Sequence, residues 1–141
     1  MNIKMMINED MSEQEGLREI SKYLNGYSVF RRILEEKNSM IDHFGNPRNG
    51  EESDKKEGEN YELAAIARVK MFEIRRLITS MPTGDEKVFL FLHYIHGETM
   101  ESCAEKLGIS YRQVFRLKKR ALLMARRYHL RWRMEKRKCV E

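Results

Sequence analysis

The fold of this chain is indicated by residues 107–122, which read LGISYRQVFRLKKRAL. Four residues have the spacing of a helix-turn-helix motif: Ala104, Gly108, Val114 and Leu117. A small residue at 104 lets two helices approach closely, and Gly108 can adopt the positive φ that the corner between them needs. Val114 and Leu117 lie three residues apart on the second helix, so both point into a shared core. The sequence therefore predicts two helices joined by a tight turn.

The second helix of this motif is predicted to begin after Ser110. Ser110 stands at the N-cap position, and Gln113 three residues later completes a capping box. The residues expected to point outward are rich in hydrogen-bond donors and include no acid: Tyr111, Arg112, Gln113, Arg116, Lys119 and Arg120. In the major groove of double-stranded DNA, Arg can donate two bonds to guanine and Gln can bond adenine. This helix is therefore the predicted DNA-reading element.

The charge of the chain is concentrated at its C-terminal end. The formal net charge is only +5, but twelve of the 27 Lys and Arg residues lie between Tyr111 and Lys138, with one of the 22 acids. The remainder of the chain is acidic overall. A localised basic surface on an acidic body is typical of a nucleic-acid-binding protein.

Residues 105–110, EKLGIS, followed by Val114, Leu117, Ala121 and Leu122, resemble region 4 of bacterial sigma factors, the module that reads the upstream promoter element. The residues Tyr94-Ile95-His96-Gly97 continue the resemblance, which covers residues 83–125. The organisation of the whole chain, with a helical first half, a polar linker and a terminal region-4-like module, resembles the ArpU/RinA-type phage and prophage transcriptional regulators.

The resemblance implies roles for single residues of the predicted reading helix. It places Tyr111, Arg112 and Arg116 at base edges, with Gln113 beside them. The phosphate contacts that it implies are Lys118, Lys119 and Arg120. Ser110, at the N-cap, completes the predicted set of DNA-binding residues. Phe115 stands where the family often has a basic residue, and Arg112 replaces a frequent acid. These two departures indicate a target sequence other than the housekeeping promoter element.

The predicted fold is all-α, with an N-terminal helical hairpin and a C-terminal helix-turn-helix domain that ends in a long helix. The expected divisions are a flexible segment 1–12, a hairpin 13–81 whose linker at about 45–60 is disordered, and a DNA-binding domain 82–141 with a basic tail. Pro47 is the only residue between Gly45 and Asn60 that is not Gly or polar, which suggests a linker. Thr83 and Glu86 are expected to form a second capping box. Asn25-Gly26 is expected to kink or break the first helix of the hairpin.

Apolar residues at spacings of three, four and seven predict both helices of the hairpin. In the first helix these residues are Leu17, Ile20, Leu24, Tyr27, Leu34 and Ile41. In the second they are Leu63, Ile66, Val69, Phe72 and Ile78, with Leu77 alongside. Neither stripe can be buried by one helix alone. The helices are therefore expected to pair with each other or with a second copy of the chain.

No pattern of catalytic residues occurs, so an enzyme is not expected. There is no glycine-rich phosphate loop, no nucleophile elbow and no acidic pair in an apolar setting. His93 and His96 stand at a spacing that can bind zinc, but no third ligand follows, so neither a metal nor another cofactor is expected. The two cysteines lie far apart and indicate a reducing compartment. No segment could serve as a signal peptide or span a membrane, so we expect a protein of the bacterial cytoplasm, associated with the nucleoid.

Three functions fit these observations. The first is a sequence-specific, double-stranded-DNA-binding transcriptional regulator, an activator encoded by a phage or prophage. The second is a minimal sigma factor that engages RNA polymerase directly, although residues 13–81 are acidic and place most aromatics at core spacing. The third is a helix-turn-helix adaptor that binds another protein. RNA polymerase and a second copy of the chain are the further partners to be tested.

Overall fold

A computed structural model describes residues 3–43 and 50–140, with side chains described for residues 13–36 and 58–136. Its elements are the helices α1 (Ile3–His43) and α2 (Gly50–Ser80), the short helix α3 (Asp85–Leu90), the π-helical segment η1 (Phe91–Ile95), and the helices α4 (Met100–Leu107) and α5 (Tyr111–Val140). Within these described ranges there is no strand, and the all-α prediction is confirmed.

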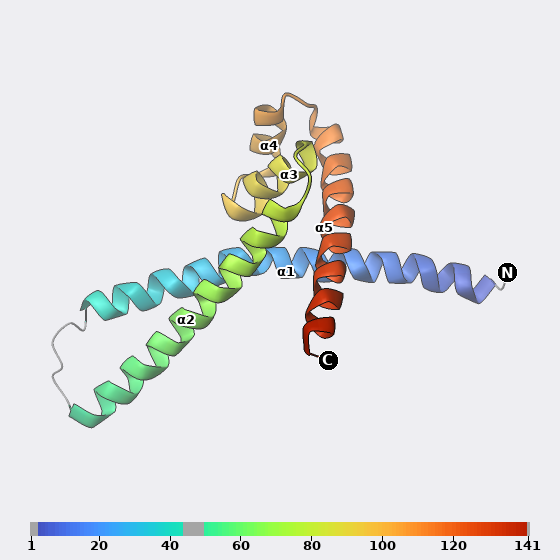
Figure 1. The fold of residues 1–141 in the computed structure, drawn as a ribbon. Helices are drawn as coiled ribbons and strands as arrows, with labels where there is room; N and C mark the ends of the chain where they lie inside the picture. The colour runs from blue at the N-terminus through green and yellow to red at the C-terminus, as the bar shows by residue number, and fades with distance from the viewer. Residues whose placement is uncertain (1–2, 44–49, 141) are drawn as a thin grey trace.

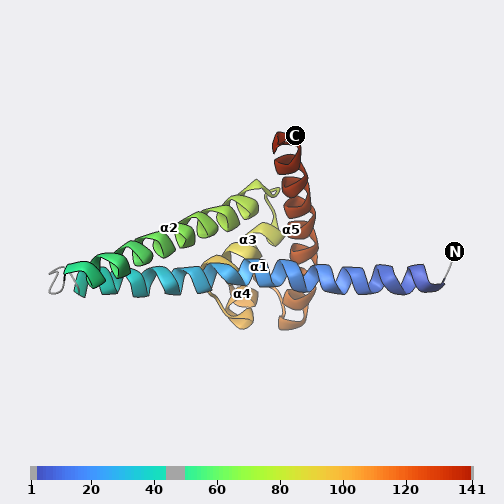
Figure 2. The same ribbon diagram turned by 90° about the horizontal axis from the view of Figure 1, so that it is seen from below.

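The predicted hairpin is confirmed: α2 runs back along α1, and the two helices make the most extensive contact between any two elements (Figure 1). The short helices α3 and α4 lie on one side of α1, and α5 crosses α1 at a steep angle (Figures 1 and 2). Helix α1 begins at Ile3, inside the segment 1–12 that was expected to be flexible. The expected interruption at Asn25-Gly26 does not break the helix, since α1 continues through both residues.

Residues 50–60, part of the linker expected to be disordered at about 45–60, form the first turns of α2. Residues 44–49 lie outside the described part of the chain. The sequence offers a physical reason for the helix: Glu51 and Lys55, Glu52 and Lys56, and Lys55 and Glu59 stand four apart. Opposite charges at this spacing favour a helix by about 0.2–0.5 kcal/mol per pair. A lack of apolar residues therefore excluded a core position for this segment, but it did not exclude a helix.

The face of α2 that packs on α1 differs from the predicted one. The buried residues of α2 are Ala64, Ala67, Ile74, Leu77 and Ile78, whereas Leu63, Ile66, Val69 and Phe72 are exposed. Alanine at positions 64 and 67 is small enough to permit a close approach of packed helix backbones. Of the predicted α2 stripe, Ile78 faces the core, together with Leu77, which was expected alongside it.

The predicted stripe of α1 is confirmed within the described residues. Ile20, Leu24 and Tyr27 are buried, and Leu17 and Leu34 are half-buried. Ile41 lies outside the residues whose side chains are described.

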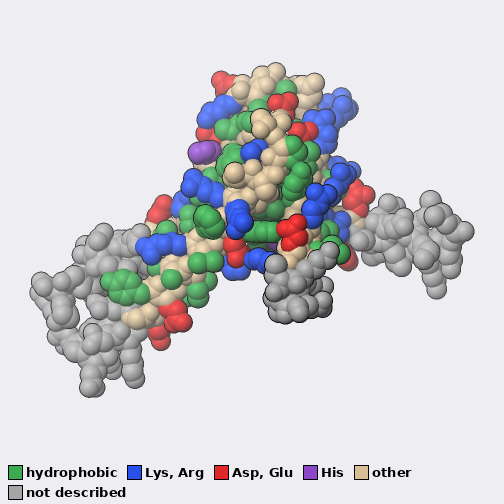
Figure 3. Space-filling view, viewed as in Figure 1, with side chains coloured by type: hydrophobic (Ala, Val, Ile, Leu, Met, Phe, Trp, Pro, Cys, Tyr) green, Lys and Arg blue, Asp and Glu red, His purple; other side chains and the backbone are tan. Residues whose placement is uncertain are grey.

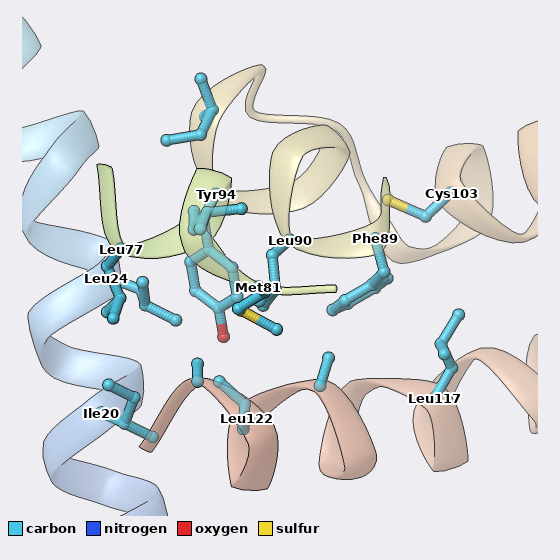
Figure 4. Packing of buried hydrophobic residues seen from close by; sticks show 14 of the residues in the cluster. Ile20, Leu24, Leu77, Met81, Phe89, Leu90, Tyr94, Cys103, Leu117 and Leu122 are labelled. Carbon is cyan, nitrogen blue, oxygen red and sulfur yellow. The ribbon is translucent and has the colours of Figure 1, made fainter. Parts of the chain in front are cut away.

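One hydrophobic core joins the hairpin to the helix-turn-helix segment. It contains Ile20 and Leu24 of α1, Leu77 of α2, Phe89 of α3 and Leu117 of α5 (Figure 4). Polar contacts reinforce the junction: the Ser21 and Tyr94 hydroxyl oxygens lie 3.4 Å apart, and Arg31 donates a hydrogen bond to the carbonyl oxygen of Ile95. Because the core is shared, the position of α5 depends on the packing of α1 and α2.

The apolar run Val88–Leu92 is explained by this internal packing. Phe89 and Leu90 are fully buried, Phe91 and Leu92 pack against the core from partly exposed positions, and only Val88 is exposed. The run therefore needs no further partner. In the basic tail, Tyr128 and Trp132 likewise pack against the core, while Leu130 and Met134 are exposed.

Candidate DNA-binding surface

The turn of the motif lies where the sequence predicts it. Helix α4 ends at Leu107, and Gly108 adopts φ 66° and ψ 34°, the left-handed conformation. The backbone N–H groups of Gly108 and Ile109 donate to the carbonyl oxygens of Glu105 (3.2 Å) and Ala104 (3.0 Å). These bonds satisfy two of the carbonyl groups that the end of a helix leaves unpaired. The turn therefore fixes the direction in which α5 leaves α4.

The capping box at the start of α5 is confirmed. The backbone N–H of Gln113 donates to the Ser110 hydroxyl (3.1 Å), and the backbone N–H of Ser110 donates to the Gln113 side-chain oxygen (3.0 Å). Each residue thus satisfies a backbone donor of the other. The Gln113 side-chain oxygen accepts one hydrogen bond in this box, while its amide NH₂ group remains free to donate to a base.

The second expected capping box is wrong. Gly84, with extended backbone, is the N-cap of α3, and no side chain caps this helix. Helix α4 has a side-chain cap that was not predicted: the Thr99 hydroxyl accepts from the backbone N–H of Ser102 at 3.1 Å. The sequence could have indicated this cap, because Thr99 follows Gly97-Glu98 directly and Thr is a favoured N-cap residue.

Replacing Ser110 with alanine should lower the free energy of unfolding by about 1 kcal/mol, because the N–H of Gln113 loses its acceptor. Replacing Gln113 with alanine removes the reciprocal bond. If the two residues act as one box, the loss in the double variant should be smaller than the sum of the two single losses. Chemical denaturation of the three variants measures this coupling, and strictly additive losses would contradict it.

One side of α5 is buried and the other is open to solvent. Val114, Leu117 and Ala121 are at most 2% exposed, and Ala104 of α4 packs near them. The residues of the opposite side that are exposed are Tyr111, Arg112, Gln113, Phe115, Arg116, Lys119 and Arg120. Figure 3 shows Lys and Arg side chains gathered along the edge of the molecule that α5 forms. The structure thus brings the predicted reading residues onto one surface.

The basic residues of this surface differ in their partners. Arg112, Arg116 and Lys119 have no carboxylate partner among the residues whose side chains are described. The Arg120 guanidinium lies 3.7 Å from a carboxylate oxygen of Glu86 in α3. Arg120 therefore forms a surface ion pair in addition to its predicted role at a phosphate. The sequence did not indicate this ion pair.

Lys118 lies at the margin of the surface, partly buried. Its charge acts on His93, whose ring stacks on Phe89 with centroids 5.4 Å apart. Burial lowers the pKa of His93, and the charge of Lys118 lowers it further, against the opposing effect of the hydrogen bond to the carbonyl of Glu98. His93 thus packs behind the helix-turn-helix and helps to hold it in place. Lys118 is the least exposed of the predicted phosphate contacts.

Glu98 ties the loop before α4 to that helix. Its carboxylate accepts hydrogen bonds from Lys106 and Ser102, and these bonds hold the pKa of Glu98 below its usual range. Its carbonyl oxygen lies 2.8 Å from Nδ1 of His93. Among the residues with described side chains, no three His, Cys, Asp or Glu residues gather as metal ligands.

Comparison with known protein families matches residues 71–124 to sigma-70, region 4. This segment of the chain is similar to sigma-70, region 4, and its α4, turn and α5 have the arrangement of a helix-turn-helix. The match begins at Met71, inside α2, so the last turns of this helix lie both in the hairpin and in the matched segment.

No curated protein and no solved structure gives a significant match to the chain. Among the described residues, no helix is long and apolar enough to cross a membrane.

Proposed function

We propose that this protein is a sequence-specific transcriptional regulator that reads the major groove of double-stranded DNA with the N-terminal turns of α5. One observation carries the proposal: Arg112, Arg116 and Lys119 are exposed on the outer side of a region-4-like helix and have no carboxylate partner among the described side chains. Unpaired guanidinium groups are available for two-point hydrogen bonds to guanine. The protein acts by binding, without catalysis and without a cofactor.

The division of labour on α5 follows from position and chemistry. Arg112 and Arg116, one turn apart near the start of the helix, are assigned to base edges, with Tyr111 and the NH₂ group of Gln113 beside them. Lys119 and Arg120, a turn further on, are assigned to phosphates with Ser110 and Lys118 at the margins. Phosphate contacts supply affinity and register, while base contacts supply specificity.

The proposal also includes the genetic origin of the protein, its place in the cell and the direction in which it regulates transcription. The chain is assigned to a phage or prophage and to the nucleoid of its bacterial host, because its organisation resembles regulators of that kind. Activation is the proposed direction, since a region-4-like module can place a bound protein beside RNA polymerase. These assignments rest on resemblance, and the DNA-binding proposal does not depend on them.

Selection of bound sequences from random DNA, followed by footprinting on the chain's own genomic neighbourhood, tests the proposal. A recurrent sequence motif that is protected upstream of a gene supports it. Binding without any sequence preference would contradict it. Transcription from the protected promoter, measured with RNA polymerase holoenzyme with and without the protein, then gives the direction of regulation.

The family match also favours a second candidate, a minimal sigma factor. Against it, the aromatic residues of α1 are used for packing: Tyr27 is buried, and Tyr23 and Phe30 pack against the core. A promoter-melting helix needs such side chains free to contact unstacked bases. Transcription with core polymerase lacking its own sigma factor separates the two candidates, because only a sigma factor would start RNA synthesis there.

The exposed apolar side of α2 supports association with a second copy of the chain. Leu63, Ile66, Val69 and Phe72 are 46–65% exposed, although the opposite side of the helix already packs on α1. One helix-turn-helix makes few base contacts, and pairing on adjacent half-sites is the usual remedy. RNA polymerase is the other proposed partner of this surface.

Replacing Val69 with glutamate should abolish self-association, because a charge would be buried in an apolar interface. Val29 of α1, which is also about half exposed (52%), provides the matched control, and Val29→Glu should leave the assembly unchanged. Sedimentation of the full chain measures both variants. Equal assembly of wild type and Val69→Glu would show that a second copy does not occupy this surface, and the same variants would then be tested for binding to RNA polymerase.

A further inference from the structure

Two aromatic side chains stand exposed at the start of α5, among the basic residues assigned to DNA. Tyr111 is 53% exposed and Phe115 is 46% exposed. Their ring centroids lie 4.9 Å apart with the planes at 85°, an edge-to-face pair. This arrangement is a favourable aromatic geometry, so each ring holds the other in place while both stay open to solvent.

The packing of the domain does not require these rings. The buried side of α5 is filled by Val114, Leu117 and Ala121, which lie on the opposite side of the helix. Phe115 is three residues from Arg112 and four from Lys119, so all three are neighbours on the outer surface. The aromatic pair therefore lies within the proposed DNA-binding surface.

The surroundings of the pair indicate a polyanionic partner. From Tyr111 to Met134 the sequence contains no acidic residue, and Arg112, Arg116 and Lys119 have no carboxylate partner among the described side chains. In the major groove, the one apolar group that a base pair presents is the methyl group at C5 of a pyrimidine. Thymine carries it always, and cytosine carries it when methylated.

We propose that Tyr111 and Phe115 form a binding site for the 5-methyl group of a pyrimidine, next to the base pairs read by Arg112 and Arg116. The two ring planes, nearly at right angles, present an apolar corner to the groove, and burying a methyl group there removes it from water. The inference rests on the proposed DNA-binding function and adds a determinant of specificity to it. It makes the protein sensitive to thymine or to cytosine methylation at one or two positions of its site.

The test uses the full chain and a duplex carrying the selected sequence. Each thymine is replaced in turn by uracil, which removes the methyl group and keeps every hydrogen-bonding group. At the contacted position the Kd should rise about fourfold, the value of one buried methyl group. At each cytosine, 5-methylcytosine is compared with cytosine. Tighter binding to the methylated base identifies methylcytosine as the source of the methyl group, and weaker binding to uracil identifies thymine.

Two variants assign the effect to the aromatic pair. Phe115→Ala should bind thymine and uracil duplexes equally well, because the apolar corner is lost. Arg116→Ala, the matched control on the same surface, should bind more weakly but keep the preference for the methylated base. Both side chains are exposed, so neither variant should lose the fold, and circular dichroism checks this.

Each result has one meaning. If the wild type selects a sequence but distinguishes neither thymine from uracil nor methylcytosine from cytosine, the methyl site is wrong while the DNA-binding function stands. The same holds if Phe115→Ala keeps the preference, because another group would then be reading the methyl. If no sequence is selected at all, the proposed function itself is wrong.

Discussion

Replacing Arg112 or Arg116 with alanine is expected to cost about 1–3 kcal/mol of binding free energy on the selected site and much less on random DNA. Both guanidinium groups are exposed and have no carboxylate partner among the described side chains, so the loss would reflect contacts to DNA and not a disturbed fold. Because each arginine is assigned to a particular base pair, its removal should also relax the sequence preference at that position.

The measurement is a titration of fluorescent duplexes of both kinds at several salt concentrations. Lys119→Ala is the matched control, because this cation is assigned to a phosphate. It should weaken binding to both duplexes alike and reduce the magnitude of the salt slope by about one. Equal losses on the two duplexes for Arg112→Ala and Arg116→Ala would show that these residues contact only phosphates.

Replacing Gly108 with valine is expected to lower the free energy of unfolding by about 2 kcal/mol or more. At φ 66° a side chain with a Cβ atom is costly, by roughly 1–2 kcal/mol, and β-branching adds to the strain. No atom lies within 4 Å of a Cβ placed there, so the cost would come from the backbone and not from a collision. If the chain relieves the strain by changing the turn, α5 is redirected and DNA binding is lost.

Thermal and chemical denaturation, together with DNA titration, measure these effects. Gly108→Ala should show a smaller loss of the same sign. Gly58 is the control glycine: it lies inside α2 with open space around it, so Gly58→Ala should stabilise the helix by up to about 1 kcal/mol. A Gly108→Val protein with unchanged stability and DNA affinity would contradict the role assigned to this turn.

Because the core is shared, the packing of the hairpin would influence the position of the helix that is proposed to bind DNA. Helix α5 carries the reading residues in its first turns, while further along it packs on α1 and α2 through residues such as Leu122, Ala125 and Trp132. A partner that binds the exposed side of α2 would therefore touch a helix whose last turns lie in the segment matched to sigma-70, region 4. The proposed association and the proposed DNA reading would then be physically linked through α2.

Several features of this protein were determined by the sequence alone, because they depend on residues a few positions apart. The spacing of Ala104, Gly108, Val114 and Leu117 predicted the turn and the buried side of α5. Ser110 and Gln113 predicted the capping box, and the run of donors without acids predicted the exposed surface. Turn dihedral angles, caps and helix faces are set by local sterics and hydrogen bonding, so a single sequence contains the necessary information.

Other features were decided only by the tertiary structure. Helix α2 has apolar residues on two sides, and the crossing of α1 selects the side with Ala64 and Ala67, leaving Val69 and Phe72 exposed. Likewise, Arg120 meets Glu86 only because α3 packs against α5. These outcomes depend on which distant segments meet and how closely their backbones approach. Spacing along a single helix does not encode that geometry, because it arises when the whole core is packed at once.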